Sequence, residues 1–163
     1  MLKGFEPIIP SAPVLLVLGS MPSAVSLEKK EYYGYAHNRF WKILHYVYDM
    51  PINNYDEKKK ILYTKQILLW DVIGECEREG SLDSAIHNER VNNIDDLIVR
   101  YPTIRKVICN GKKAYNLYQR YFSEIEVPCI YLPSTSNANR SIKEERLFEL
   151  WKQELTAFTE RIK

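Results

Sequence analysis

The sequence predicts an α/β fold in which helices cover a mostly parallel β-sheet. Four apolar runs of strand length predict the strands, at residues 13–19, 66–72, 106–111 and 128–133. None of these runs alternates apolar with polar residues, so each is expected to be buried on both faces, as parallel strands are. Helical patterns lie between the runs, and strands that alternate with helices are typical of a parallel sheet.

Five segments outside these runs predict helices. They span residues 39–49, 56–64, 92–101, 112–122 and 142–162. The last segment carries one apolar stripe at helical spacing, formed by Leu147, Trp151, Leu155, Phe158 and Ile162. The longest polar stretch, residues 73–93, is expected to lie on the surface, with a short helix near residues 82–86.

Composition favours one globular domain, residues 1–163. Apolar residues make up 45% of the chain and charged residues 27%, which is ordinary for a globular protein. The net charge of +2 is compatible with nucleic-acid binding but too small to indicate it. Cys76, Cys109 and Cys129 match no metal-binding spacing and indicate a reducing compartment. Because the chain has neither an apolar signal core nor a run of about 20 apolar residues, we expect a soluble cytoplasmic protein.

Four loops are expected to form one ligand-binding rim. In an open α/β sheet, ligands bind beyond the carboxyl ends of the strands. The loops that follow the apolar runs are "GSMPS" with its continuation to Asn38, "LWDVIGEC", "NGKK" and "PSTSNANR". Backbone N–H groups in the first loop could bind an anion or a carbonyl oxygen, or the loop could be a simple turn. The last loop could bind phosphates, or it could be solvated, with Ser141 as the N-cap of the final helix.

Asn38 is the most informative single residue. It lies within "YYGYAHNRFWKIL" and directly precedes a predicted helix, where Asn is a favoured N-cap. Its amide could also hold a water molecule or recognise the polar edge of a base, but it cannot act as a general base because it does not titrate. The neighbouring Tyr32, Tyr33 and Tyr35 could stack on a flat ligand or pack at the rim.

Charged residues at the rim have two interpretations each. Asp71 is the only acidic residue that closes an apolar run. It could be a functional carboxylate or the cap of the following turn. Lys112 and Lys113 could contact phosphates, or they could lie on a solvated helix face.

Five stretches together resemble the uracil-DNA glycosylase superfamily, and within it the hypoxanthine-DNA glycosylase branch, often called family six. They are "LVLGSMPS", "YYGYAHNRFWKIL", "LLWDVIGECEREGSLDSAI", "NGKKAY" and "YLPSTSNAN". The resemblance implies a three-layer α/β/α fold around a four-stranded, mainly parallel sheet. It also implies hydrolysis of the N-glycosidic bond of a deaminated base in double-stranded DNA, typically hypoxanthine, by a monomer that requires no metal or cofactor.

The resemblance assigns roles residue by residue. Met21 occupies the slot that usually positions water, and Leu132 occupies the slot of a catalytic histidine, so the catalytic role passes to Asn38. The implied base pocket comprises Gly19, Ser20, Met21, Pro22, Tyr33 and Asn110. The implied DNA contacts are Ser23, Ser134, Thr135, Ser136, Asn137 and Arg140. Asn137 and Arg140 depart from the pattern of the branch, which usually has proline and alanine in this loop.

These roles define an expected mechanism and two alternatives. The base leaves the stack, Tyr33 stacks on it, and backbone N–H groups near Ser20 and Met21 stabilise its oxygen. Asn38 holds the attacking water, and no lyase step is expected because no lysine is placed as a nucleophile. One alternative is a DNA- or nucleotide-binding module of the same fold without catalysis. The other is a glycosylase that prefers uracil.

Overall fold

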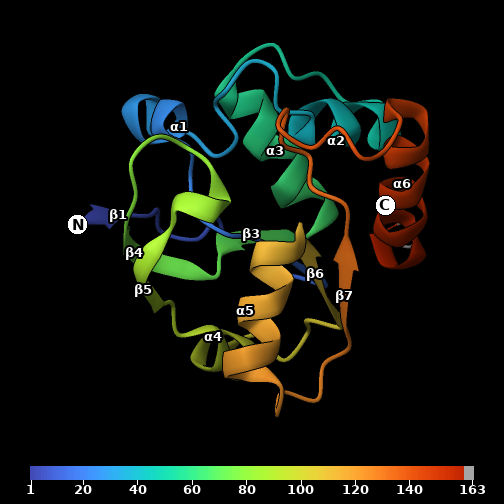
Figure 1. Ribbon diagram of the computed structural model, residues 1–163. Coiled ribbons are helices and arrows are strands. Elements are labelled where there is room, and N and C mark those ends of the chain that lie inside the picture. Colours follow the sequence, from blue (N-terminus) through green and yellow to red (C-terminus); the bar gives the residue numbers. More distant parts are fainter. Residues whose placement is uncertain (160–163) are drawn as a thin grey trace.

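The computed structural model describes residues 1–159, and its central element is a four-stranded parallel sheet (Figure 1). The strands are β2 (Leu15–Gly19), β3 (Ile67–Asp71), β6 (Lys106–Asn110) and β7 (Cys129–Leu132). They lie in the order β3-β2-β6-β7, and every neighbouring pair is parallel. The structure therefore confirms the four predicted strands.

Helices cover both faces of this sheet and complete three layers (Figure 1). One face is covered by α2 (Phe40–Tyr48), α3 (Tyr55–Lys65) and α6 (Glu144–Thr159). The other is covered by α4 (Ile94–Arg100) and α5 (Lys112–Phe122). Side chains of β2 alternate between the layers, with Leu15 and Val17 in the first core cluster and Leu16 and Leu18 in the second. Burial on both faces explains why this strand is apolar throughout, and the predicted three-layer α/β/α class is confirmed.

The predicted helices are confirmed, with small shifts at their ends. In α6, Leu147, Trp151 and Leu155 are fully buried, as their helical spacing predicts. The predicted stripe continues to the side chain of Phe158 and to Ile162, which lie outside the described part of the chain. Within residues 1–159, no helix combines the length and the apolar character needed to cross a membrane.

The expectation that residues 73–93 are only polar surface is wrong. They form β4 (Ile73–Glu77) and β5 (His87–Val91), which pair antiparallel in a second sheet of order β1-β4-β5 with β1 (Leu2–Lys3). Ile73 and Cys76 are fully buried. Register shifts along the β4–β5 pair interrupt the regular alternation that would have indicated a strand. The expected short helix is present as a 3₁₀ turn, η1 (Asp83–Ala85).

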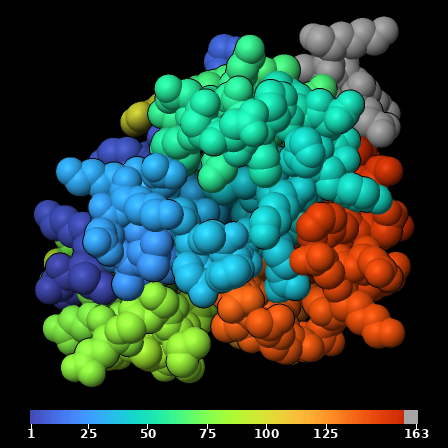
Figure 2. Space-filling model, turned by 90° about the horizontal axis from the view of Figure 1, so that it is seen from above, coloured from blue at the N-terminus to red at the C-terminus, as the bar shows by residue number. Residues whose placement is uncertain are grey.

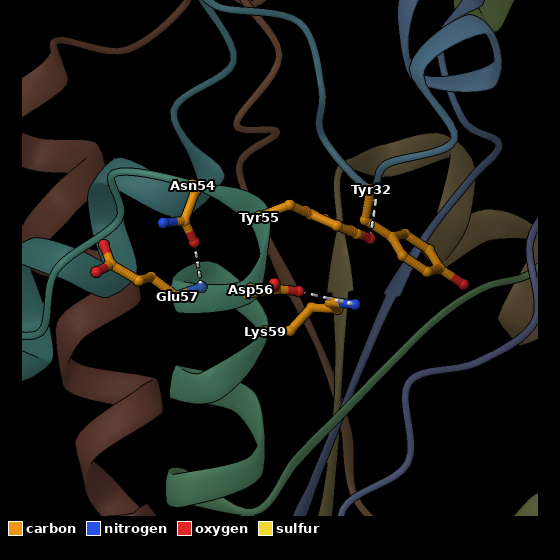
Figure 3. A network of polar contacts seen from close by, with 6 residues as sticks. All are labelled: Tyr32, Asn54, Tyr55, Asp56, Glu57 and Lys59. Atoms are coloured by element: carbon orange, nitrogen blue, oxygen red, sulfur yellow. Dashed lines mark hydrogen bonds and ion pairs between the residues drawn. The ribbon is translucent and has the colours of Figure 1, made fainter.

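Polar contacts at the start of α3 connect this helix to the segment that leads into the rim loops (Figure 3). Asn54 caps the helix, because its side-chain oxygen accepts a hydrogen bond from the Glu57 backbone N–H at 2.8 Å. The Tyr55 hydroxyl accepts a hydrogen bond from the backbone N–H of Tyr32 at 3.0 Å. Tyr32 also donates its own hydroxyl to the Glu6 carbonyl at 2.8 Å. The segment that carries Asn38 therefore starts from a fixed position.

Candidate active site

A cavity of about 650 Å³ opens at the carboxyl edge of the parallel sheet. All four predicted rim loops contribute to its lining, through residues 19–23, Asp71, Asn110 with Lys112, and residues 134–139. Further parts of the wall come from residues 81–84 and from Tyr32, Tyr33, Tyr35 and Asn38. Figure 2 looks onto this side of the molecule, where the blue, yellow-green and orange segments that carry these residues meet. The volume lies within the range of roughly 300–1,000 Å³ that is usual for small-molecule sites.

The first loop brings polar groups close to the backbone. A Cβ atom on Gly19 would lie 2.5 Å from Asp71 Oδ1 and 2.8 Å from the Tyr33 hydroxyl oxygen, so only glycine fits there. The Ser20 hydroxyl donates a hydrogen bond to Asp83 Oδ1 at 2.7 Å. Met21 is 7% exposed and packs in the second core cluster while also lining the cavity.

The next two residues of this loop lead into a short helix. Pro22 and Ser23 line the cavity. The Ser23 hydroxyl oxygen caps α1 (Ala24–Lys29) by accepting a hydrogen bond from Ser26 N. The apolar pattern does not predict α1, because its six residues bury only Ser26.

The three tyrosines before Asn38 have different environments. Tyr32 is 3% exposed and belongs to the first core cluster. Tyr35 is 39% exposed at the mouth of the cavity. Tyr33 lines the cavity with a positive φ of 52°, and its ring stacks on Phe40 with centroids 4.2 Å apart. Burial and then the charge of Asp71 raise the pKa of Tyr33 above its ordinary value, so its hydroxyl stays protonated.

Asn38 caps α2 with its side chain, and the same side chain lines the cavity. Its Oδ1 accepts hydrogen bonds from Phe40 N at 2.9 Å and from the Thr135 hydroxyl at 2.9 Å. Because a backbone N–H can only donate, the oxygen of the amide must face Phe40. Both lone pairs of Oδ1 are therefore occupied, and Nδ2 is the group that Asn38 can offer to a ligand. The N-cap position itself lies one residue further on, at Arg39, whose side chain makes no cap hydrogen bond.

A chain of hydrogen bonds fixes the orientation of Asn38. Asn110 Oδ1 accepts from Thr135 N at 3.0 Å, so Asn110 Nδ2 must be the group that donates to the Thr135 hydroxyl at 3.0 Å. The same Nδ2 donates to the Tyr33 hydroxyl at 3.1 Å. Thr135 consequently has its own proton available for Asn38. The network joins the end of β6, the last loop and the start of α2.

The last loop is held by a buried arginine that the sequence reasoning did not single out. Arg39 is 8% exposed, and its guanidinium donates to the backbone oxygens of Thr135, Ser136 and Asn139 at 3.3, 2.7 and 3.2 Å. The sequence feature that could have indicated this role is the position of Arg39 directly after Asn38 in "NRFW". Because these bonds fix the loop from beneath, its outward groups keep a defined arrangement.

The residues of the last loop divide between its surface and its interior. Ser134, Ser136 and Asn137 line the cavity. Arg140 is exposed and donates to Asn137 Oδ1 at 3.0 Å, so the two departures from the branch pattern contact each other. Thr135 is fully buried, and its hydroxyl is engaged by two amides. These two observations correct the expectation that Thr135 contacts DNA directly.

Two further residues with expected roles are Leu132, which does not line the cavity, and Ser141, which does. Leu132 is 5% exposed and belongs to the first core cluster. Ser141 donates its hydroxyl to Asn139 Oδ1 at 2.6 Å, while the Leu147 N–H bonds to the Lys143 carbonyl. These contacts exclude Ser141 as the N-cap of α6, because the helical hydrogen bonds begin at Lys143.

Asp71 ends β3 with an unusual carboxyl group. It is 4% exposed and lines the cavity, and its Oδ2 has no hydrogen-bond partner among the described residues. Burial first, and the neighbouring charge of Asp83 second, raise its pKa from 3.8 to about 7, although Arg78 opposes the rise. The carboxyl group does not cap the following turn, because Val72 N bonds to the Gly19 carbonyl and Ile73 N to the Ser20 carbonyl.

This architecture defines an α/β protein with a base-sized cavity whose polar groups come mainly from amides, hydroxyls and the carboxyl groups of Asp71 and Asp83. Residues 7–156 match the family model of the uracil DNA glycosylase superfamily. The chain is 34% identical to the hypoxanthine DNA glycosylase of Methanosarcina acetivorans, over 88% of this chain and 92% of that protein. It is 35% identical to the hypoxanthine DNA glycosylase of Methanosarcina barkeri, over 85% and 88%.

A solved structure agrees with these matches. An NMR structure of a Methanosarcina acetivorans protein assigned to the uracil DNA glycosylases superposes with a TM-score of 0.84 and 32% identity, covering 96% of this chain and 97% of that one. The chain belongs to the uracil DNA glycosylase superfamily. It is therefore a DNA glycosylase, a hydrolase of the N-glycosidic bond, which confirms the resemblance found in the sequence.

Proposed function

We propose that this glycosylase removes hypoxanthine from double-stranded DNA, and that Asn38 holds the attacking water. The observation that carries the proposal is the fixed carboxamide of Asn38 in the cavity wall, held by Phe40 N and the Thr135 hydroxyl. The names of the two Methanosarcina relatives support hypoxanthine as the base. A cavity of about 650 Å³ has room for a purine.

The base reaches this cavity by leaving the duplex. Unstacking and unpairing cost a few kcal/mol, and they cost least for a mispaired base such as hypoxanthine. Tyr33 lines the cavity, with its ring supported by Phe40 and its hydroxyl by Asn110. A side chain held in this way loses little conformational freedom when a base packs against it, which supports Tyr33 as the stacking residue.

The chemical step depends mainly on the departing base. The bond between C1′ of the sugar and N9 of the base breaks, which leaves an oxocarbenium-like sugar and negative charge on the base. Asn38 Nδ2 donates to a water and leaves a second lone pair of that water free to attack C1′. The water adds its oxygen to C1′ and releases one proton, and the departing base takes up one proton. Backbone N–H groups near Ser20 and Met21 stabilise the oxygen of the base.

This mechanism lacks a strong base, so we expect modest turnover. Met21 and Leu132 occupy slots where relatives in the superfamily can use polar side chains, and both pack in the core. Neither side chain can orient water or polarise the base. The reaction also ends at the abasic site, because the proposal includes no lysine nucleophile, and no cofactor is part of it.

The DNA backbone contacts the mouth of the cavity in this proposal. Its contacts are Ser23 from the first loop and Ser134, Ser136, Asn137 and Arg140 from the last loop, and Thr135 is no longer among them. Hydroxyl, amide and guanidinium groups at a rim position a duplex by binding phosphate oxygens. A single domain over residues 1–163, action as a monomer and a cytoplasmic location stay predictions from the sequence.

A uracil-preferring enzyme is the second candidate. The family model that matches residues 7–156 is that of the uracil DNA glycosylases, and the cavity admits a pyrimidine as well as a purine. The two candidates are distinguished by duplexes that carry a single deoxyinosine or a single deoxyuridine, treated with alkali after incubation. We expect the faster strand breakage on deoxyinosine, and faster breakage on deoxyuridine would favour the second candidate.

A binding module without catalysis is separated by the same experiment. Asn38→Ala should abolish breakage of the deoxyinosine duplex. Asn116→Ala, an exposed residue on α5 away from the cavity, is the matched control and should act like the unmodified chain. Tight binding of the lesion duplex without any breakage would show that the fold has kept recognition and lost chemistry.

A further inference from the structure

Two thiols that take no part in the proposed mechanism lie in contact on the face of the sheet that α5 covers. Cys109 lies near the end of β6 and Cys129 begins β7, and their Sγ atoms are 3.6 Å apart. Val107 pairs in register with Cys129, so the two cysteines are diagonal neighbours on one face of the sheet. A small movement of the side chains brings the two sulfur atoms towards the bonding distance of about 2.05 Å.

The two thiols differ in exposure and in the hold on their protons. Cys109 is fully buried, whereas Cys129 is partly exposed on β7, which is an edge strand of the four-stranded sheet. A hydrogen bond donated by Cys109 raises the pKa of Cys109 and lowers the pKa of Cys129. Because the thiolate is the attacking form of a thiol, Cys129 is the accessible nucleophile of the pair and Cys109 is the thiol that can resolve its adduct.

A third polar group belongs to the same cluster. Tyr118 on α5 is 2% exposed, and its hydroxyl has no hydrogen-bond partner in the described part of the chain. Burial first, and then the charges of Cys129 and Cys109, raise the pKa of Tyr118 above its ordinary value. The hydroxyl therefore keeps its proton when a neighbouring thiol ionises. A buried donor without a partner is rare in native folds, and here it can stabilise the negative charge on a thiolate.

The cysteine pair adjoins the hydrogen-bond network that orients Asn38. Cys109 is followed directly by Asn110, whose side chain bonds to the Thr135 hydroxyl, and Thr135 bonds in turn to Asn38. Cys129 begins the strand that leads into the last loop. A disulfide fixes both the distance between its sulfur atoms and a dihedral angle near 90°, so its formation displaces the two strands relative to each other. In a close-packed interior such a displacement reaches the neighbouring residue, Asn110.

We propose that Cys109 and Cys129 form a reversible disulfide under oxidising conditions, and that this bond slows base excision by displacing Asn110. The inference concerns the regulation of the site rather than its chemistry. It rests on the proposed function, because the displaced network is the one that holds Asn38.

The co-reactant is a small-molecule disulfide such as glutathione disulfide. The Cys129 thiolate attacks one sulfur of the co-reactant, which breaks its S–S bond, releases one glutathione thiolate and leaves a mixed disulfide on Cys129. Cys109 then gives up its proton and attacks Cys129 Sγ, which releases the second glutathione. The protein loses two protons and two electrons in forming the bond, and the two glutathione molecules gain them.

The test treats the complete chain with an excess of glutathione disulfide, blocks the remaining thiols after unfolding and identifies linked peptides by mass spectrometry. We expect one pair of peptides joined through Cys109 and Cys129. Single-turnover excision from a deoxyinosine duplex should be about tenfold slower than for the reduced chain, and dithiothreitol should restore it. A bond that does not form, or one that forms and leaves the excision rate unchanged, would overturn the proposal.

Cys129→Ala and Cys76→Ala are the matched variants. Cys129→Ala removes the nucleophile, so it should excise like the reduced unmodified chain and keep that rate in the oxidant. Cys76→Ala removes the remaining thiol, which is buried in the second sheet, and should still form the bond and slow down. If the oxidant slows Cys129→Ala as much as the unmodified chain, the effect does not come from this pair and the proposal is wrong.

Two readouts separate this inference from the proposed function. The linked peptides are detected without any excision. In NMR spectra, the side-chain amide signals of Asn110 and Asn38 should shift when the unmodified chain is oxidised and should stay in place in Cys129→Ala. Both results stand even if Asn38→Ala shows that the proposed catalytic role is wrong. Amide signals that stay in place after the bond has formed would contradict a connection between the cysteine pair and the site.

Discussion

Thr135→Val tests whether the hydrogen-bond network aims Asn38 at the substrate. Thr135 is fully buried, and its hydroxyl accepts from Asn110 at 3.0 Å and donates to Asn38 at 2.9 Å. Valine has nearly the same shape but no hydroxyl, so the substitution removes both bonds and leaves the packing almost unchanged. Asn38 Oδ1 then keeps only its bond from Phe40 N, and Asn110 Nδ2 keeps only the Tyr33 hydroxyl.

The expected magnitudes follow from these two bonds. Each contributes about 1 kcal/mol net, so the free energy of unfolding should fall by about 2 kcal/mol. The effect on excision should be larger, because the amide of Asn38 can now rotate away from its position. A misplacement of about 1 Å typically costs about 100-fold in rate. We therefore expect kcat to fall by about 100-fold while the protein remains folded.

The assay compares Thr135→Val with Thr135→Ser. Urea unfolding gives the change in stability, and single-turnover excision of hypoxanthine from a duplex gives the change in the chemical step. Serine keeps the hydroxyl and loses only a methyl group, so Thr135→Ser should retain most of the activity. The reasoning is refuted if Thr135→Val excises at the unmodified rate, or if serine and valine impair excision equally.

Three further predictions concern the residues around the cavity. Burial raises the pKa of Asp71 from 3.8 to about 7, so the free energy of unfolding should fall as the pH rises from 3.8 to 7. Asp71→Asn removes this titration and should therefore raise the free energy of unfolding above pH 7 by on the order of 4 kcal/mol, and leave it nearly unchanged below pH 3.8. Urea titrations at both ends of this pH range measure the two differences. Gly19→Ala places a Cβ 2.5 Å from Asp71 Oδ1. It should lower the free energy of unfolding by about 1–3 kcal/mol and remove most of the excision activity. An unchanged free energy of unfolding would contradict the close packing. Arg39→Met leaves backbone oxygens of the last loop without their donor. It should lower the midpoint of thermal unfolding and weaken DNA binding. An unchanged affinity for the lesion duplex would show that the loop is organised without the guanidinium.

The main sheet could be predicted from the sequence because its strands are buried on both faces. Leu15 to Leu18 are all fully buried, so β2 is apolar without interruption and differs clearly from its surroundings. The second sheet could not be predicted in this way. Strands β4 and β5 are partly exposed, and the register shifts between them remove the period of two on which strand prediction depends.

The candidate site was predictable as a set of loops but not as a network. The carboxyl ends of parallel strands meet at one edge, which brings Asn110 and the last loop together, since Asn110 pairs in register with Leu132. Which amide faces which hydroxyl depends on loop conformation that no local pattern encodes. The same holds for Arg39, whose charge would ordinarily indicate exposure. The unpaired state of Asp71 also becomes visible only when Gly19, Asp83 and Arg78 are placed around it.

Asn38 shows how a local pattern can have two correct interpretations. Its spacing predicted a helix cap, and the resemblance implied a role in the site. The structure combines the two, because one oxygen accepts from Phe40 N as a cap and from the Thr135 hydroxyl as part of the network. The cap therefore fixes the amide in the cavity wall.

The central claim is tested most directly by the single-turnover rate constant for hypoxanthine release by Asn38→Ala, measured with enzyme in excess over the lesion duplex. We expect the rate constant to fall by about 100-fold or more, with the affinity for the duplex nearly unchanged, because the amide contacts the attacking water rather than the DNA backbone. Release at the rate of the unmodified enzyme would show that another group positions the water and would contradict the account.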